Sequence, residues 1–99
     1  MGAGPFAALQ ELAELLETNP NVTVALVGHT DNTGPLDVNI TISRRRAESV
    51  RQHLIANYEV RAGRLTSHGV GFLSPNADNG TEEGRQANRR VEAVVLPAQ

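Results

Sequence analysis

The chain has 99 residues, of which 39% are apolar and 20% are charged, and this size allows one small domain with a single core. The lack of cysteine excludes a disulfide framework and a thiolate metal site, and a formal net charge of −2 argues against a dedicated nucleic-acid-binding protein. No stretch reaches the ~18 apolar residues of a membrane helix, and the first residues lack the basic-then-apolar order of a signal peptide.

The first half of the chain predicts a helix, a strand and a second helix. Leu9, Leu12 and Leu16 recur at three- and four-residue intervals, which predicts a helix over residues 5–18. The β-branched, apolar run VTVALV (22–27) is typical of a strand that is covered on both faces. A turn-rich loop follows, and the next helix is expected at residues 41–58, capped by Asn39 or Thr41.

The second half is less regular. It predicts a short strand at 65–70, a polar loop at 71–88 with one helical turn near 82–88, and a last strand at 90–96. We therefore expect one α+β domain over residues 5–96. Its architecture would be a two-layer sandwich, a mixed β-sheet with helices packed on one face. Residues 1–4 are expected to be an added or flexible start outside the domain.

The segment GHTDNTG (28–34) carries one more carboxylate than a turn needs, that of Asp31. On a helical wheel of residues 41–58, Arg46 falls inside an apolar stripe that begins with Ile42. An arginine at the edge of a core needs an acceptor, because an unpaired buried charge is strongly destabilising. A strand–loop–helix connection brings the loop close to the first helical turns, so Asp31 is expected to lie near Arg46.

Two interpretations of this pair remain open from the residues alone. In the first, Asp31 and Arg46 form a structural salt bridge in a small protein-interaction domain. In the second, they flank a cleft, where the planar guanidinium of Arg46 binds a carboxylate and Asp31 accepts from an ammonium. That arrangement would suit a zwitterionic amino-acid head group.

Three sequence blocks together resemble one known family. GHTDNTG (28–34), NITISRRRA (39–47) and NADNGTEEGRQANRRVEAVVL (76–96) occur in the order and at the spacing of the OmpA-like C-terminal peptidoglycan-binding domain, found in proteins of the OmpA, Pal and MotB types. The resemblance covers residues 5–96, with Ile42 in place of the usual leucine. One departure is evident: family domains normally begin with a further strand, whereas this chain starts at the first helix.

The resemblance implies non-covalent binding of the peptidoglycan stem peptide. Asp31 and Arg46 match the family residues that hold the ammonium and the carboxylate of meso-diaminopimelate. Further positions are carried over to the same pocket: Asn39 and Ile42 as lining residues, and Asn32, Thr33 and Gly34 through their backbone groups. The implied protein needs no cofactor and no metal, and it is not an enzyme.

The resemblance also implies a setting. Family members anchor outer membranes, lipoproteins or motor stators to the wall, so we expect a periplasmic protein attached to or facing the outer membrane of a Gram-negative bacterium. A sheet edge exposed by the absent first strand would be able to pair with another chain, which would give a homodimer.

The other chemistry-bearing residues favour structural roles. His29, His53 and His68 are too far apart in sequence for a metal motif, and His29 is expected to brace its turn by hydrogen bonding. Ser43 could belong to a hydrolase triad, but it lacks the context of a nucleophile. The arginines of the third block are expected to tie the 71–88 loop to carbonyls or carboxylates rather than to bind nucleic acid. They are Arg85, Arg89 and Arg90.

Overall fold

The computed structural model describes the backbone of residues 4–96 and the side chains from residue 8 onward. The side chain of Phe6, predicted to belong to the first apolar face, and residues 1–3 of the expected start lie outside the described part. The elements occur in the predicted order. They are α1 (Gly4–Thr18), β1 (Thr23–His29), α2 (Leu36–Tyr58), the 3-10 turn η1 (Ala62–Arg64), β2 (Leu65–Gly69), α3 (Glu82–Asn88) and β3 (Arg90–Leu96).

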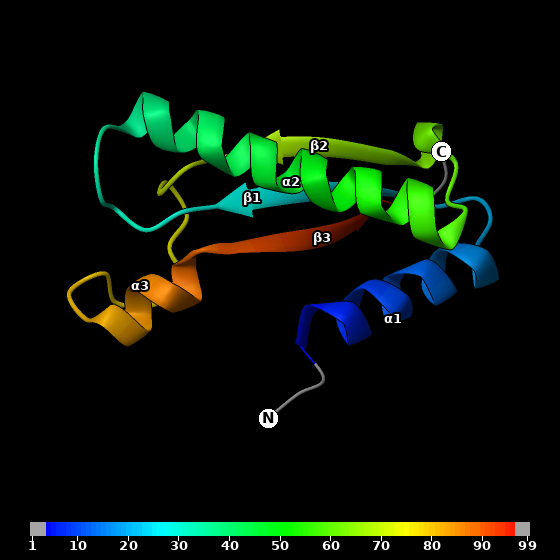
Figure 1. Ribbon diagram of the computed structural model, residues 1–99, viewed down its shortest axis with the longest axis horizontal. Coiled ribbons are helices and arrows are strands. Elements are labelled where there is room, and N and C mark those ends of the chain that lie inside the picture. Colours follow the sequence, from blue (N-terminus) through cyan, green and yellow to red (C-terminus); the bar gives the residue numbers. More distant parts are fainter. Residues whose placement is uncertain (1–3, 97–99) are drawn as a thin grey trace.

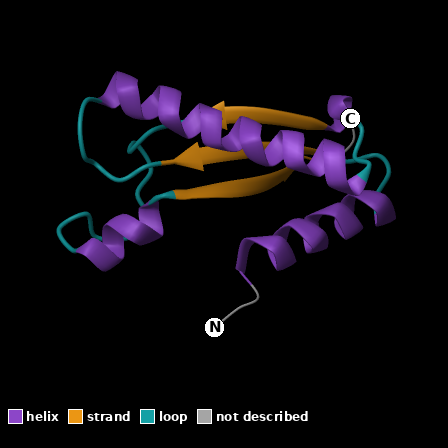
Figure 2. Ribbon diagram, viewed as in Figure 1, coloured by secondary structure: helices purple, strands orange, loops and turns teal. Residues whose placement is uncertain are grey.

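The strands form one mixed sheet with β1 in the centre. The order is β2-β1-β3, with β2 parallel and β3 antiparallel to β1. In Figure 1, α2 crosses in front of the sheet, α1 lies below the C-terminal half of α2, and α3 stands at the end where β3 begins. Figure 2 shows the same arrangement by type of element.

Both long helices pack on the same face of the sheet. Val24 and Leu26 alternate along β1 and therefore point to one side, where they share a core with Leu16 of α1 and Leu54 of α2. Ala47, Val60 and Leu65 complete the buried cluster. This confirms the predicted α+β class, with a mixed sheet and helices on one face.

Two boundaries differ from the prediction by more than one residue. Strand β1 continues to His29, because His29 still pairs with Arg90 of β3. Helix α2 begins at Leu36, five residues earlier than expected. Asn39 is not a cap: its side-chain amide lies inside the helix and donates to the carbonyls of Thr33 (2.8 Å) and Pro35 (3.0 Å), which fastens the preceding loop to the first turn.

The predicted apolar stripe of α2 was wrong in its first half. The buried residues there are polar, Asn39 and Ser43, followed by Ala47 and Leu54. Ile42 is 36% exposed. The wheel failed because it assigned the buried face to the apolar side chains, whereas hydrogen bonds allow Asn39 and Ser43 to be buried without an unsatisfied polar atom.

Two neighbouring glycines let α2 approach the sheet. A Cβ on Gly28 would lie 1.9 Å from the carbonyl oxygen of Ser43, and one on Gly69 would lie 2.4 Å from the amide nitrogen of Arg44. Gly28 and Gly69 are register partners in β1 and β2. The Ser43 hydroxyl donates to the Ile40 carbonyl (2.9 Å) and accepts from the amide of Gly71 (3.0 Å). These contacts fix the first half of α2 over the ends of both strands.

The loop before α3 is organised by Asn88, which is completely buried. Its side-chain oxygen accepts from the amides of Asn76 (2.7 Å) and Ala77 (2.9 Å), and its amide donates to the Ala77 carbonyl (3.0 Å). Thr81 caps α3 by accepting from the amide of Gly84 (2.9 Å). The predicted helical turn at 82–88 is confirmed, and the polar loop has a defined path.

Strand β3 forms one edge of the sheet in the described part of the chain. Its last three residues, Val94, Val95 and Leu96, are 42–43% exposed. The expected pairing of this edge with another chain stays a prediction. Within residues 4–96, no helix combines the length and the apolar character that crossing a membrane requires.

Candidate functional site

The carboxylate of Asp31 lies at the mouth of β1, where the strand gives way to the loop. Asp31 is only 7% exposed. Its Oδ1 accepts from the backbone amide of Thr33 (3.0 Å), which closes a tight turn at this point of the GHTDNTG segment. The amide of Thr30 donates to the Gly71 carbonyl (2.8 Å), so the loop is held from β2's side as well.

The other oxygen of Asp31 is bound by Arg89, 58 residues away in sequence. Nη1 of Arg89 donates to Oδ2 of Asp31, while Nη2 donates to Glu82 (2.8 Å) and Gln86 (2.6 Å) on α3. The sheet register explains the meeting: Arg90 opposes His29, so the residue before Arg90 reaches the segment just after His29. Arg89 therefore joins the loop after β1 to α3.

The charge state of this pair is well defined. The backbone amide of Thr33 is the main cause of a lowered pKa for Asp31, and Arg89 lowers that pKa further, against the effect of burial. The pKa of Glu82 is also lowered, first by Arg89 and then by Arg85. Asp31 is thus an ionised acceptor at neutral pH.

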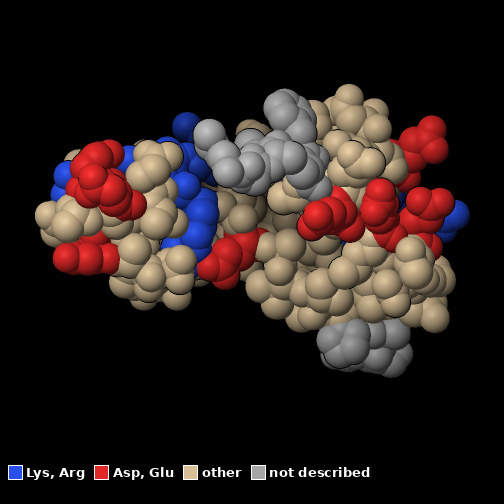
Figure 3. Space-filling model, turned by 90° about the horizontal axis from the view of Figure 1, so that it is seen from below, with Lys and Arg blue, Asp and Glu red and all other residues tan. Residues whose placement is uncertain are grey.

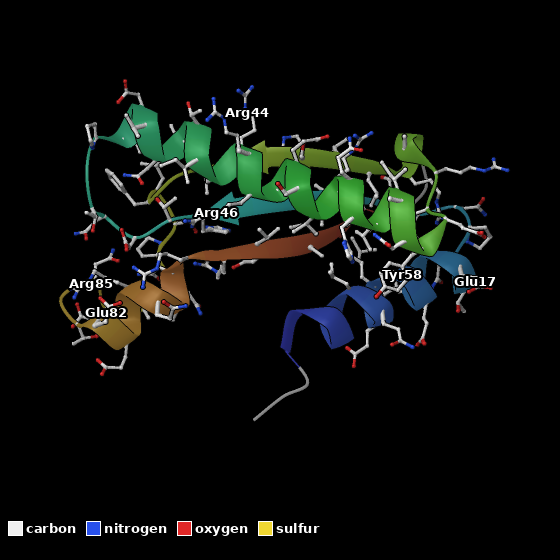
Figure 4. The ribbon with its side chains drawn as sticks, in the orientation of Figure 1. Glu17, Arg44, Arg46, Tyr58, Glu82 and Arg85 are labelled. Atoms are coloured by element: carbon white, nitrogen blue, oxygen red, sulfur yellow. The ribbon has the colours of Figure 1, made fainter. Side chains whose placement is uncertain are left out.

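Arg46 lies on the flank of α2 that faces β3. The side chains of Glu48 and Arg51 reach Ser67 (2.7 Å) and Leu65 (3.0 Å) of β2, which places the opposite flank at β2. Arg46 and Ile42 are four residues apart and share the other flank. Figure 4 shows Arg46 on the side of α2 toward β3, and Arg44 on the far side.

The expected burial of Arg46 at the core edge was wrong. Arg46 is exposed, and among the described residues it forms no hydrogen bond or ion pair. The structural salt bridge that was one interpretation is therefore formed by a different arginine, Arg89 instead of Arg46. The charge on Arg46 needs no internal partner because water reaches it.

The remaining predicted site residues differ in burial. Asn39 is buried and holds the loop carbonyls, as described above. The other members are exposed and lie on the loop or on the adjacent flank of α2, with Gly34 in the left-handed region (φ +86°). They are Asn32, Thr33, Gly34 and Ile42.

Sequence reasoning missed Arg89 as the partner of Asp31. It expected the third-block arginines to tie the loop to carbonyls or carboxylates, and this is confirmed: Arg85 donates to the Asn79 carbonyl (2.9 Å) and Arg90 to the Ser74 carbonyl (3.2 Å). Which carboxylate Arg89 binds depends on the pairing of β3 with β1, for which no local signal exists. Figure 3 shows arginine side chains gathered where α3 meets the rest of the molecule, with acidic side chains beside them.

His29 does not brace its turn as expected. Its ring is buried, and neither ring nitrogen forms a hydrogen bond with a residue of the 28–34 segment. Nε2 lies 3.8 Å from the Glu92 carboxylate, which Arg90 binds at 2.6 Å. Burial, followed by the charge of Arg90, lowers the pKa of His29, so the ring is neutral at neutral pH.

The arrangement suits a small ligand that carries both signs of charge. Within residues 4–96, no cluster of histidine, aspartate and glutamate is suited to hold a metal ion. A cavity of about 670 Å³ lies elsewhere, between α1 and the C-terminal end of α2, with Tyr58 and Arg64 in its lining. The loop after β1 instead offers an ionised carboxylate beside the guanidinium of Arg89. A carboxylate can bind an ammonium, and a guanidinium can bind a carboxylate.

The chain has clear relatives among known proteins. The outer membrane protein Omp38 of Acinetobacter baumannii is 46% identical over 87 residues, which are 88% of this chain and 24% of Omp38. The peptidoglycan-binding protein ArfA of Mycobacterium tuberculosis is 40% identical over 90 residues, which are 91% of this chain and 27% of ArfA. The chain therefore spans about a quarter of the length of these two relatives.

The fold is also shared with a solved structure. The peptidoglycan-associated lipoprotein of Burkholderia pseudomallei superposes with a TM-score of 0.83 at 29% identity, over 91% of this chain and 75% of that one. The sequence model of the OmpA family matches residues 6–89. Since this match takes in most of the chain, including the Asp31 loop, Arg46 and Arg89, the chain belongs to the OmpA family.

Proposed function

We propose that this domain binds bacterial peptidoglycan through the free end of diaminopimelate and so anchors a cell-envelope protein to the wall. The names of its relatives support the coarser part of this proposal, because ArfA is a peptidoglycan-binding protein and the Burkholderia structure is of a peptidoglycan-associated lipoprotein. None of the three names describes an enzyme, in agreement with the prediction that this chain is not one.

One observation supports the finer part: Asp31 is a buried, ionised carboxylate beside the guanidinium of Arg89. Arg89 binds it directly, and Arg46 stands exposed on the flank of α2 that faces β3. The free end of diaminopimelate has an ammonium and a carboxylate on one carbon atom. Asp31 would accept from the ammonium, and the planar fork of Arg46 would bind the carboxylate.

The neighbouring residues have supporting roles in this proposal. Asn39 keeps the loop carbonyls in place and so preserves the position of the Asp31 turn. Ile42, exposed next to Arg46 on the same flank, would pack against the aliphatic part of the ligand. The backbone groups of Asn32, Thr33 and Gly34 would form the rim.

We further infer a periplasmic location, with attachment to or contact with the outer membrane. Omp38 is an outer membrane protein, and the Burkholderia relative is a lipoprotein. Because this chain spans about a quarter of Omp38 and of ArfA, the whole protein's activity and partners are part of the proposal.

A titration tests the proposal. The chain would be titrated, by calorimetry or by NMR, with the tripeptide L-Ala-γ-D-Glu-meso-diaminopimelate and with its L-lysine counterpart, which lacks the carboxylate on the carbon that carries the side-chain ammonium. We expect binding of the first peptide, with a preference of about tenfold or more over the second, since one charge-assisted interaction is lost. Equal binding of both peptides, or of neither, would contradict the diaminopimelate assignment.

Arg46→Ala is the matching variant, and Arg44→Ala is its control. Both side chains are exposed on α2, but they lie on opposite flanks of the helix. We expect Arg46→Ala to weaken binding of the diaminopimelate peptide by about tenfold, and Arg44→Ala to leave it unchanged. Equal effects of the two substitutions would indicate only general attraction by positive charge.

A further inference from the structure

We infer that Arg89 makes the Asp31 site selective for groups that carry both an ammonium and a carboxylate, because Arg89 occupies Asp31 until a ligand supplies a replacement carboxylate. This inference rests on the proposed function and deepens it. It assigns selectivity to a pair of residues that are already bound to each other before the ligand arrives.

The first step is that both oxygens of Asp31 already accept a hydrogen bond. Oδ1 accepts from the amide of Thr33 and Oδ2 accepts from Arg89. The Thr33 amide belongs to the backbone of the turn and cannot leave without opening it. The side chain of Arg89, by contrast, is free to rotate and is 27% exposed. A ligand would therefore displace Arg89 and not the Thr33 amide.

The second step is that Arg89 can leave Asp31 without losing its place. Nη2 of Arg89 remains bound to Glu82 (2.8 Å) and Gln86 (2.6 Å), both on α3. The guanidinium would therefore stay beside the site, with the donor Nη1 released. A released donor next to the bound ligand favours any ligand that offers it an acceptor.

The third step compares two ligands by charge. A simple ammonium would replace one cation at Asp31 by another and would leave Arg89 with an unpaired donor, so little free energy of binding is gained. A zwitterionic group would replace Arg89 at Asp31 and would also offer its carboxylate to Arg89 and to Arg46. With the zwitterionic group, Asp31 and Arg89 each keep a partner of opposite charge, and no two like charges are brought together. With the simple ammonium, Arg89 loses its partner, and this difference makes the site reject a ligand that lacks the carboxylate.

The test uses Arg89→Gln, with Arg85→Gln as control. Arg85 lies on α3, four residues before Arg89, and it also binds Glu82 (3.0 Å), but it forms no hydrogen bond or ion pair with Asp31. The ratio of affinities for the diaminopimelate and lysine tripeptides is measured for each chain. We expect Arg89→Gln to lower that ratio by about tenfold, because the lysine ammonium reaches Asp31 more easily and the zwitterion loses a donor. Arg89→Lys should restore part of the ratio.

A merely structural role for Arg89 would reduce the affinity for both peptides equally and leave the ratio unchanged, which would overturn the inference. A second measurement needs no variant: the side-chain Nε–H signal of Arg89 should shift differently when the wild-type chain binds the two peptides at equal occupancy, because only the diaminopimelate peptide offers Arg89 a carboxylate in place of Asp31. Equal shifts would also overturn it. If the wild type binds neither peptide, it is the proposed function that fails, and this outcome is distinct from an unchanged ratio.

Discussion

The carbonyl oxygen of Ser43 occupies the space where Gly28 would carry a side chain, since a Cβ there would lie 1.9 Å from it. Contact at this distance cannot be relieved by rotating a side chain, because the obstructing atom belongs to the backbone of α2. The close approach seats the first half of α2 on the end of β1, the strand that leads into the Asp31 loop.

Gly28→Ala should therefore destabilise the domain by about 3 kcal/mol or more, because α2 must move away from β1. Chemical denaturation measures the change. Gly63→Ala is the matched control: nothing lies within 4 Å of a Cβ at Gly63, so its effect should stay within about 0.5 kcal/mol. Equal effects at the two glycines would show that α2 does not need this contact.

Ser43→Ala should lower stability without removing any catalytic activity. The hydroxyl of Ser43 is buried and accepts from the Gly71 amide, which the substitution leaves unpaired, at a cost of about 1–3 kcal/mol. Ser49→Ala, at an exposed position of the same helix, controls for helix propensity. Cleavage of the wall tripeptides by the wild type, lost in Ser43→Ala, would instead support a nucleophile.

Asn88→Ala should loosen the loop that carries α3. It removes an acceptor shared by the backbone amides of residues 76 and 77 and a donor to the Ala77 carbonyl, so we expect a loss of about 1–3 kcal/mol and weaker hydrogen-exchange protection of residues 76 and 77. Because Arg89 follows Asn88 directly, binding of the diaminopimelate peptide should weaken as well. Asn21→Ala, at an exposed position, is the control. Unchanged protection at residues 76 and 77 would contradict this role.

Protonation of His29 should lower the free energy of unfolding in mild acid. The pKa of His29 is lowered in the folded state, so the unfolded chain binds its proton more readily. The contribution is complete above the unfolded value of about 6.5 and is lost as pH falls from there through the lowered folded pKa. His29→Gln should flatten the dependence of unfolding free energy on pH in that window. His68→Gln, on the exposed side of β2, serves as control, and an unchanged slope in His29→Gln would exclude His29 as the source.

Protonation of Asp31 should also lower the free energy of unfolding, but at a lower pH than protonation of His29. Its pKa is lowered in the fold, chiefly by the Thr33 amide and then by Arg89, so the stability that it contributes is present above about pH 4 and is lost as pH falls through the folded pKa. Asp31→Asn should remove this part of the acid dependence and abolish peptide binding while the chain still folds. Loss of the fold in Asp31→Asn, seen by NMR, would favour a purely structural Asp31.

The sequence by itself determined the elements and their order. The apolar spacing in α1, the β-branched run in β1 and the alternation in β3 are local patterns, and each formed the predicted element, because local packing decides between a period of 3.6 and a period of 2. The three blocks also identified the loop residue Asp31 and the family. The start of α2 was missed because an asparagine that bonds backward to the loop resembles a cap in sequence.

Only the tertiary structure decided which residues meet. The helical wheel predicted that Arg46 and Ile42 lie on the buried face, but α2 turns Asn39 and Ser43 toward the sheet. Two glycines in adjacent strands leave room there, and hydrogen bonds satisfy the polar atoms. Arg89 reaches Asp31 through the register of β3 on β1. Contacts between residues 58 positions apart follow from how separate elements pack, and no pattern within either element carries that information.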